Sequence, residues 1–145
     1  MALADMRQPI ESGCPDGLQY MHPVSVKNFG QWKYHEHPRA GVLKHVADNG
    51  DELWTVRAGT QRILDLFTLR KLCDIGDEYA DGHIHFTIRS NIEYLVADQA
   101  KVNPLIEKLE AEGFVVGGTQ NSVAMISTPK VGCTATSPAP TPPAW

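Results

Sequence analysis

Residues 83–96, with the sequence HIHFTIRSNIEYLV, contain two apolar runs that decide the fold class. Over residues 83–89 successive side chains point to opposite faces, so that Ile84, Phe86 and Ile88 share one face. The opposite face of this run is polar and ends with Thr87 and Arg89. A second apolar run, residues 92–96, follows after two polar residues. The segment therefore predicts two consecutive strands of a sheet.

A helix is predicted on each side of this pair of strands. The first begins at Thr68, a residue type that caps helices, and ends near Tyr79, before Asp81-Gly82. Its apolar positions lie near one face and are Leu69, Leu72, Cys73, Ile75 and Tyr79. The second helix begins at Asp98 and ends at Gly113. Its apolar stripe consists of Val102, Leu105, Ile106 and Leu109.

Upstream, Asn49-Gly50 separates two apolar alternating runs, residues 41–48 and 52–56, which is the pattern of a β-hairpin. Residues 114–116 supply a closing strand. From residue 51 the order of elements is β-α-β followed by β-α-β, which is the ferredoxin-like arrangement. We therefore predict an α+β domain over residues 40–127, with an antiparallel sheet and both helices on one face.

The two ends of the chain differ from this domain. Residues 1–39 are predicted to be an irregular arm that packs either on another subunit or on its own domain. Residues 128–145 are rich in Pro, Thr and Ala and have no periodicity, so their composition predicts a disordered tail.

Length and charge narrow the class of protein. The chain has 145 residues, enough for one domain with a core, and a formal net charge of −4. The acidic balance argues against a nucleic-acid partner or an anionic membrane surface. No apolar run approaches the roughly 18–20 residues that span a bilayer, and residues 1–17 lack a signal-peptide pattern. We therefore expect a soluble cytoplasmic protein.

Polar residues near one edge of the predicted sheet are candidates for binding an anion. Arg89 lies beside Thr87 and Asn91, so that a guanidinium group, a hydroxyl and an amide occur together. Arg57 ends the neighbouring predicted strand and Arg62 follows it. Three arginines at one edge would favour an oxyanion or a carboxylated ligand. The alternative interpretation is that these arginines are solvated and paired with Glu or Asp.

The histidines and cysteines give weaker evidence for a binding site than the arginines do. Two His-x-His pairs, His35/His37 and His83/His85, would each place two imidazoles on one side of a strand. No Cys, Asp or Glu is placed to complete a metal site, so these are interpreted as surface histidines. Cys73 is predicted to be a small core residue and Cys14 an exposed thiol. Three dispersed cysteines cannot complete a four-thiolate cluster site.

Three stretches together resemble the β subunit of dissimilatory-type sulfite reductases. They are KYHEHPRAGVLKHVADNGDELWTVRAG at 33–59, LRKLCDIGDEYADGHIHFTIRSNIEYLV at 69–96 and GFVVGGTQNSVAMIS at 113–127. The pattern TxRxNxE, here residues 87–93, is typical of the sulfite and nitrite reductase superfamily. The opening MRQPIESGCPDG, followed by YMHPV, resembles the oxidative-type enzymes of sulfur-oxidising bacteria.

The resemblance implies a specific chemistry. These enzymes are α₂β₂ assemblies with sirohaem coupled to a [4Fe–4S] cluster, and they interconvert sulfite and reduced sulfur. Their first ferredoxin-like half supplies arginines to the sirohaem carboxylates and to the substrate oxyanion. The motif arginine matches Arg89, and Arg57 also falls on a matching position. The resemblance therefore implies that Arg89, Arg57 and Arg62, with Thr87 and Asn91, bind the cofactor, and that an α subunit and sulfite are the partners. The alternative is a non-catalytic ferredoxin-like module that binds a ligand or a partner.

The chain departs from the family after Ser127. The family continues with His-Thr-Gln-Gly-Trp and a His-Cys segment that carries a cluster ligand, whereas this chain reads TPKVGCTATSPAPTPPAW. Codons can be chosen for this tail that, read from the last base of the Ser127 codon, encode HTQGWLHCHQPRTDASGV. One lost base therefore explains the tail as an out-of-frame sequence in which Cys133 is not a ligand. We expect the cluster ligands to be absent from this chain, and the chain alone to be inactive.

Overall fold

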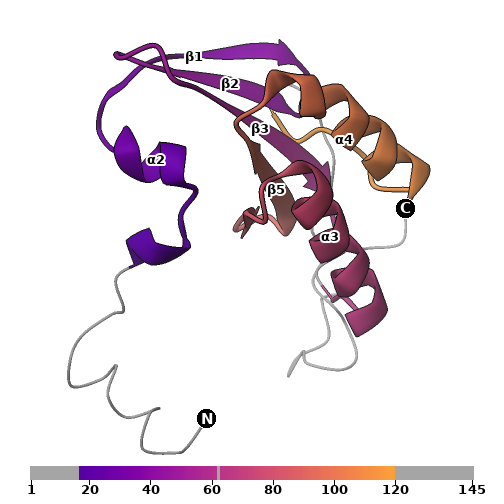
Figure 1. Ribbon diagram of the computed structural model, residues 1–145. Helices are drawn as coiled ribbons and strands as arrows, with labels where there is room; N and C mark the ends of the chain where they lie inside the picture. The colour runs from indigo at the N-terminus through magenta and orange to yellow at the C-terminus, as the bar shows by residue number, and fades with distance from the viewer. Residues whose placement is uncertain (1–16, 62, 120–145) are drawn as a thin grey trace, which may run out of the picture.

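The computed structural model describes residues 17–61 and 63–119 (Figure 1). A 3₁₀ helix η1 (Gly17–Tyr20) and a short helix α2 (Pro23–Lys27) precede the sheet. The remaining elements, in chain order, are β1 (Trp32–Arg39), β2 (Val42–Ala47), β3 (Glu52–Gly59), α3 (Leu66–Tyr79), β4 (Ile84–Phe86), β5 (Asn91–Val96) and α4 (Gln99–Ala111). No helix among the described residues is both long and apolar enough to traverse a bilayer.

The sheet is antiparallel, with the strand order β1-β2-β3-β5-β4. The hairpin predicted at Asn49-Gly50 joins β2 to β3, and Gly50 has the positive φ of 88° that such a turn requires. Residues 114–116 form an isolated bridge between Val116 and Ala58, and not the full closing strand that we expected. The predicted α+β, ferredoxin-like fold is confirmed.

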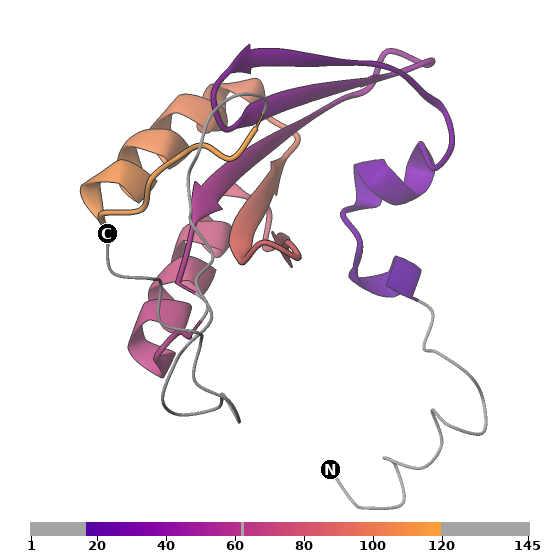
Figure 2. The same cartoon turned by 180° about the vertical axis from the view of Figure 1, so that it is seen from behind.

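One face of the sheet carries the core. Trp54, Val56 and Ala58 of β3 alternate with residues of the opposite face, and all three are buried. Both long helices pack on this face, and every residue of the predicted α4 stripe is buried. Figures 1 and 2 show α3 and α4 together on one side of the sheet and α2 on the other. The prediction of both helices on one face is therefore correct.

Several local predictions were wrong. The α3 helix is capped by Asp65, whose carboxylate accepts from the backbone N–H of Thr68 at 2.7 Å, so Thr68 lies inside the first turn. Cys73 is exposed and not part of the core, because the buried residues of α3 are Leu72, Ile75 and Gly76. The strand expected over residues 83–89 is only three residues long, and Ile88 is fully exposed in the turn that follows.

The predicted irregular arm contains a strand. All of β1 except Trp32 is exposed, so its sequence has no buried face from which to predict it. Its backbone pairs with β2, with His35 directly opposite His45, and this pairing holds the strand.

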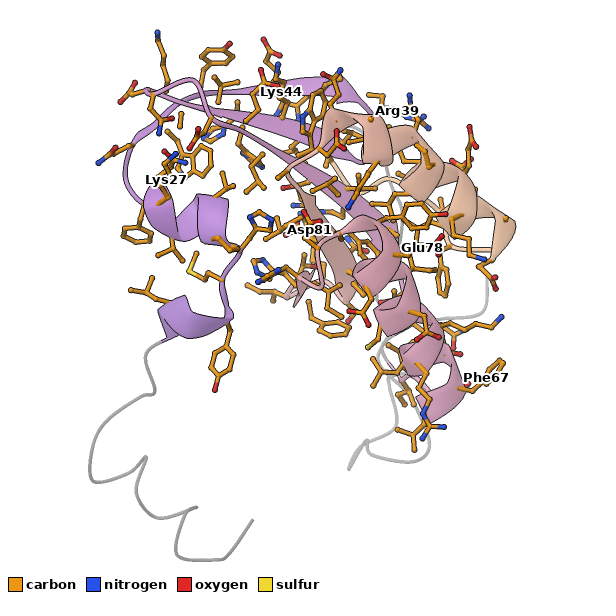
Figure 3. The ribbon with its side chains drawn as sticks, viewed as in Figure 1. Lys27, Arg39, Lys44, Phe67, Glu78 and Asp81 are labelled. Carbon is orange, nitrogen blue, oxygen red and sulfur yellow. The ribbon has the colours of Figure 1, made fainter. Side chains whose placement is uncertain are left out.

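The residues between η1 and β1 contact their own domain. His22 is buried and lies 3.6 Å from the carboxylate of Asp81, which sits between α2 and the end of α3 (Figure 3). Asn28 and Lys27 bind the carboxylate of Asp51 at 2.9 and 2.7 Å. The structure therefore shows the own-domain packing that we considered for this segment. Residues 1–16, Arg62 and the predicted tail at 128–145, with Cys14 and Cys133, lie outside the described residues.

Candidate anion-binding edge of the sheet

A tight turn, residues 87–90, joins β4 to β5 and contains the first four residues of the TxRxN pattern, whose Asn91 begins β5. The N–H of Ser90 donates to the carbonyl of Thr87 at 3.0 Å, and the N–H of Thr87 donates to the carbonyl of Asn91 at 2.8 Å. Ser90 adopts a left-handed φ of 61°, a conformation compatible with a small polar residue in a turn. The hydroxyl of Thr60, just beyond β3, donates to the carbonyl of Ser90 at 2.6 Å. The turn is thereby fixed to the end of β3.

Arg89 is exposed at the tip of this turn. We expected it on a strand, but the strand ends at Phe86 and Arg89 occupies the turn. Within the described part of the chain, no carboxylate forms an ion pair with Arg89. Its positive charge is therefore available to an external anion, because the guanidinium group offers five N–H donors and always remains charged.

Thr87 and Asn91 have structural contacts that the sequence pattern did not predict. The hydroxyl of Thr87 accepts from the backbone N–H of Asn91 at 3.0 Å. Asn91 is only 4% exposed, and its side-chain oxygen has no hydrogen-bond partner among the described residues. A buried acceptor without a donor costs about 1–3 kcal/mol, so Asn91 would gain from a donor supplied at this edge.

Arg57 lies on the sheet face opposite the helices and is paired with Glu93. Its Nε donates to the Glu93 carboxylate at 2.6 Å, a second guanidinium nitrogen contacts the same oxygen, and Nη1 donates to the carbonyl of Gly118 at 2.8 Å. The two residues are direct cross-strand partners of β3 and β5. The interpretation of paired arginines therefore describes Arg57, whereas Arg89 has the free charge that an anion site requires.

The structure brings four of the five predicted residues to one end of the β3–β5 pair. Asn91 is the cross-strand partner of Gly59, and Arg57 is one step further along the same face. Arg62 lies outside the described residues, so the third arginine stays a prediction. Sequence analysis included Glu93 in the TxRxNxE pattern but did not predict its pairing with Arg57, because that pairing follows only from the register of β3 and β5.

A cavity of about 380 Å³ lies near this edge, where Gly59, Thr60 and Asp65 face residues 112–115. None of the described candidate residues lines it. Its rim includes the exposed side chains of Ile63 and Val115. The cavity therefore borders the arginine edge through Gly59 and Thr60 but is not lined by Arg57 or Arg89.

The described residues offer no metal centre of three or more ligands. No group of three His, Cys, Asp or Glu side chains among them is placed to hold an ion. His83 instead bonds the carbonyl of Asp81 through Nδ1 at 2.8 Å, and His35 contacts His45 and not His37. Burial lowers the pKa of His22, and Asp81 opposes this shift.

Comparison with known proteins places residues 45–112 in the family described as the nitrite/sulfite reductase ferredoxin-like half domain. The chain is 46% identical over 112 residues to a dissimilatory-type sulfite reductase subunit β from Archaeoglobus fulgidus, a match that covers 77% of this chain and 31% of that protein. It is 43% identical over 115 residues to the same subunit of Nitratidesulfovibrio vulgaris, covering 74% of this chain and 30% of that protein.

A third relative, the corresponding subunit of Megalodesulfovibrio gigas, is 36% identical over 115 residues, covering 74% of this chain and 44% of that protein. The resemblance to the β subunit of dissimilatory-type sulfite reductases is thereby confirmed, and the resemblance to the oxidative type stays a prediction. The chain spans less than half the length of these relatives.

Proposed function

Because residues 45–112 belong to the nitrite/sulfite reductase ferredoxin-like half-domain family, we propose that this chain is part of a dissimilatory-type sulfite reductase β subunit. In this proposal an α subunit is its partner, sulfite is the substrate of the assembled enzyme, and the enzyme is cytoplasmic. The observation that carries the assignment of the site is the exposed guanidinium group of Arg89 at a fixed turn, which has no ion-pair partner among residues 17–61 and 63–119.

The described residues fit the carboxylate-bearing cofactor of this family better than its cluster. Arg89 would bind a sirohaem carboxylate, since guanidinium–carboxylate contacts are charge-assisted and frequently bidentate. Asn91 would donate to a carboxylate from its side-chain NH₂ group, because an ionised carboxylate can only accept, and Arg62 would add a second cation. Sirohaem and its [4Fe–4S] cluster would supply electrons to sulfite when both are bound.

The contribution of this chain would be positioning and charge compensation. Arg89 would offset the negative charge of the bound anion, and the hydrogen bonds of the turn would hold its backbone in place. Arg57 is mostly neutralised by Glu93, so its direct role in anion binding would be smaller. No described cysteine is placed with other ligands to hold a cluster, and Cys73 is alone and exposed on α3. We infer that the chain by itself does not catalyse sulfite reduction.

Titration of sirohaem into the full chain tests the proposed site, with tryptophan fluorescence as the readout. Arg89→Ala should weaken binding about tenfold, which corresponds to about 1.4 kcal/mol. Arg70→Ala is the matched control, because Arg70 is exposed on α3 and has no predicted role. Equal affinities for Arg89→Ala and the unmodified chain would overturn the assignment. A sirohaem Soret band accompanied by cluster absorption in the purified chain would contradict the inference of inactivity.

A further inference from the structure

Two histidines face each other across β1 and β2 on the surface of the sheet. His35 and His45 are direct cross-strand partners, with ring centroids 4.8 Å apart and their Nδ1 atoms 2.7 Å apart. Two nitrogens at this distance share one proton, because each ring nitrogen is a donor only when protonated. Removal of that proton leaves a lone pair on each of the two neighbouring Nδ1 atoms.

The ring of His45 is held in place from behind. Its Nε2 lies 2.9 Å from the hydroxyl oxygen of Thr55, which is 5% exposed on the neighbouring strand β3. When Nε2–H donates to this hydroxyl, Nδ1 carries the lone pair and points at His35. Histidines that bind metals in proteins are commonly oriented by a hydrogen bond from their other ring nitrogen. Thr55 supplies that contact here.

The pair must widen and turn to hold an ion. With bonds of about 2.0–2.1 Å, two imidazole nitrogens on one ion lie about 2.9–3.4 Å apart, depending on the bond angle. The present separation of 2.7 Å therefore needs to widen by a few tenths of an ångström, and the rings need to rotate so that both Nδ1 lone pairs meet on the ion instead of facing each other. His35 is exposed on β1, an edge strand that nothing covers on its outer side among the described residues, so it is free to make this movement.

We propose that His35 and His45 form a two-histidine chelate for a divalent ion of the imidazole-preferring class, such as Ni²⁺, Cu²⁺ or Zn²⁺. The remaining positions of the ion would be filled by water, because no third ligand stands with these two among the described residues. This pair differs from the His-x-His pairs, which the structure does not bring together as a site. The proposal is independent of the sulfite reductase assignment.

Calorimetric titration of Ni²⁺ into the full chain tests the chelate, with the cysteines alkylated beforehand to remove thiolate ligands. We expect one site, and about a tenfold or greater loss of affinity for His35→Ala and for His45→Ala. His37→Ala is the matched control, since His37 is exposed on the same strand, and its affinity should stay within about twofold of the unmodified chain.

Thr55→Val adds a test of the positioning role, because it removes only the hydroxyl behind His45. It should weaken Ni²⁺ binding while leaving His35 and His45 intact, and circular dichroism would show whether each variant keeps its fold. If His45→Ala or Thr55→Val unfolds, His35→Ala alone still tests the proposed chelate, because the His35 side chain is exposed. Binding that is unchanged in His35→Ala, lost in His37→Ala or absent from the unmodified chain would overturn the proposal.

Discussion

Removal of Arg57 should reveal how strongly the Arg57–Glu93 pair supports the fold. The two side chains are 18% and 16% exposed, and at least two guanidinium nitrogens contact the carboxylate. Exposed ion pairs contribute about 0–1 kcal/mol, whereas breaking a buried pair costs about 3–5 kcal/mol. Because the pair is mostly buried, Arg57→Met should lower the free energy of unfolding by about 2–4 kcal/mol. Part of this loss would come from the hydrogen bond that Arg57 donates to the carbonyl of Gly118.

Urea unfolding followed by tryptophan fluorescence measures this change. The double variant Arg57→Met/Glu93→Leu should recover most of the loss, since it leaves no unpaired buried charge. Lys71→Ala is the control, because the Lys71–Glu112 pair is 42% and 26% exposed and should contribute about 1 kcal/mol or less. A loss below about 0.5 kcal/mol in Arg57→Met, or additive losses in the double variant, would refute the reasoning.

The same pair links stability to the proposed site. Glu93→Gln removes the charge that competes with an external anion for Arg57, while it keeps the shape of the side chain. This variant should be less stable than the unmodified chain yet bind sirohaem more tightly.

Three further predictions concern other parts of the chain. Burial lowers the pKa of His22 below its ordinary value of 6.5, with Asp81 opposing the shift, so the stability from neutral His22 is present above about pH 6.5 and is lost as the pH falls toward the folded-state pKa. His22→Gln should therefore reduce the dependence of stability on pH in this range. Urea unfolding midpoints measured above and below pH 6.5 test this expectation. Gly76→Ala would place a Cβ 2.9 Å from a methyl group of Ile84, and the crowding, which costs about 1–3 kcal/mol, should exceed the helix gain of about 1 kcal/mol and lower the melting temperature. Resequencing the coding DNA across the codon of Ser127 separates the two origins of the frameshift: an additional C there would show a sequencing error, whereas an unchanged sequence would show that the gene itself has lost the base.

The elements that the sequence predicted well have one-sided burial or a specific turn signal. The four buried residues of α4 recur at helical spacing, and Asn49-Gly50 marks a hairpin independently of the rest of the fold. Strand β1 was missed because neither of its faces is buried, so its formation depends on backbone pairing with β2. The cap of α3 was misplaced by three residues because Asp65 and Thr68 are both capping residue types.

The sequence indicated which residues lie near the candidate site, but not which arginine forms an ion pair with a carboxylate. The pattern at residues 87–91 placed Thr87, Arg89 and Asn91 near one another, but we expected a strand where the structure has a turn at residues 87–90, followed by Asn91 at the start of β5. Which arginine is neutralised depends on the register between β3 and β5, and that register is set by the packing of the core face. The contact of His35 with His45 was unpredictable because it depends on the pairing register of β1, a strand without a buried face.

A comparison of sirohaem with its fully esterified form tests whether the charge of Arg89 recognises the carboxylates of a tetrapyrrole. Esterification removes the negative charges but keeps the ring, so the difference in dissociation constant isolates the contribution of the carboxylates. We predict that the unmodified chain binds the free acid about tenfold more tightly than the ester, and that Arg89→Ala loses most of this preference. Equal binding of the two forms by the unmodified chain, or an undiminished preference in Arg89→Ala, would contradict the account.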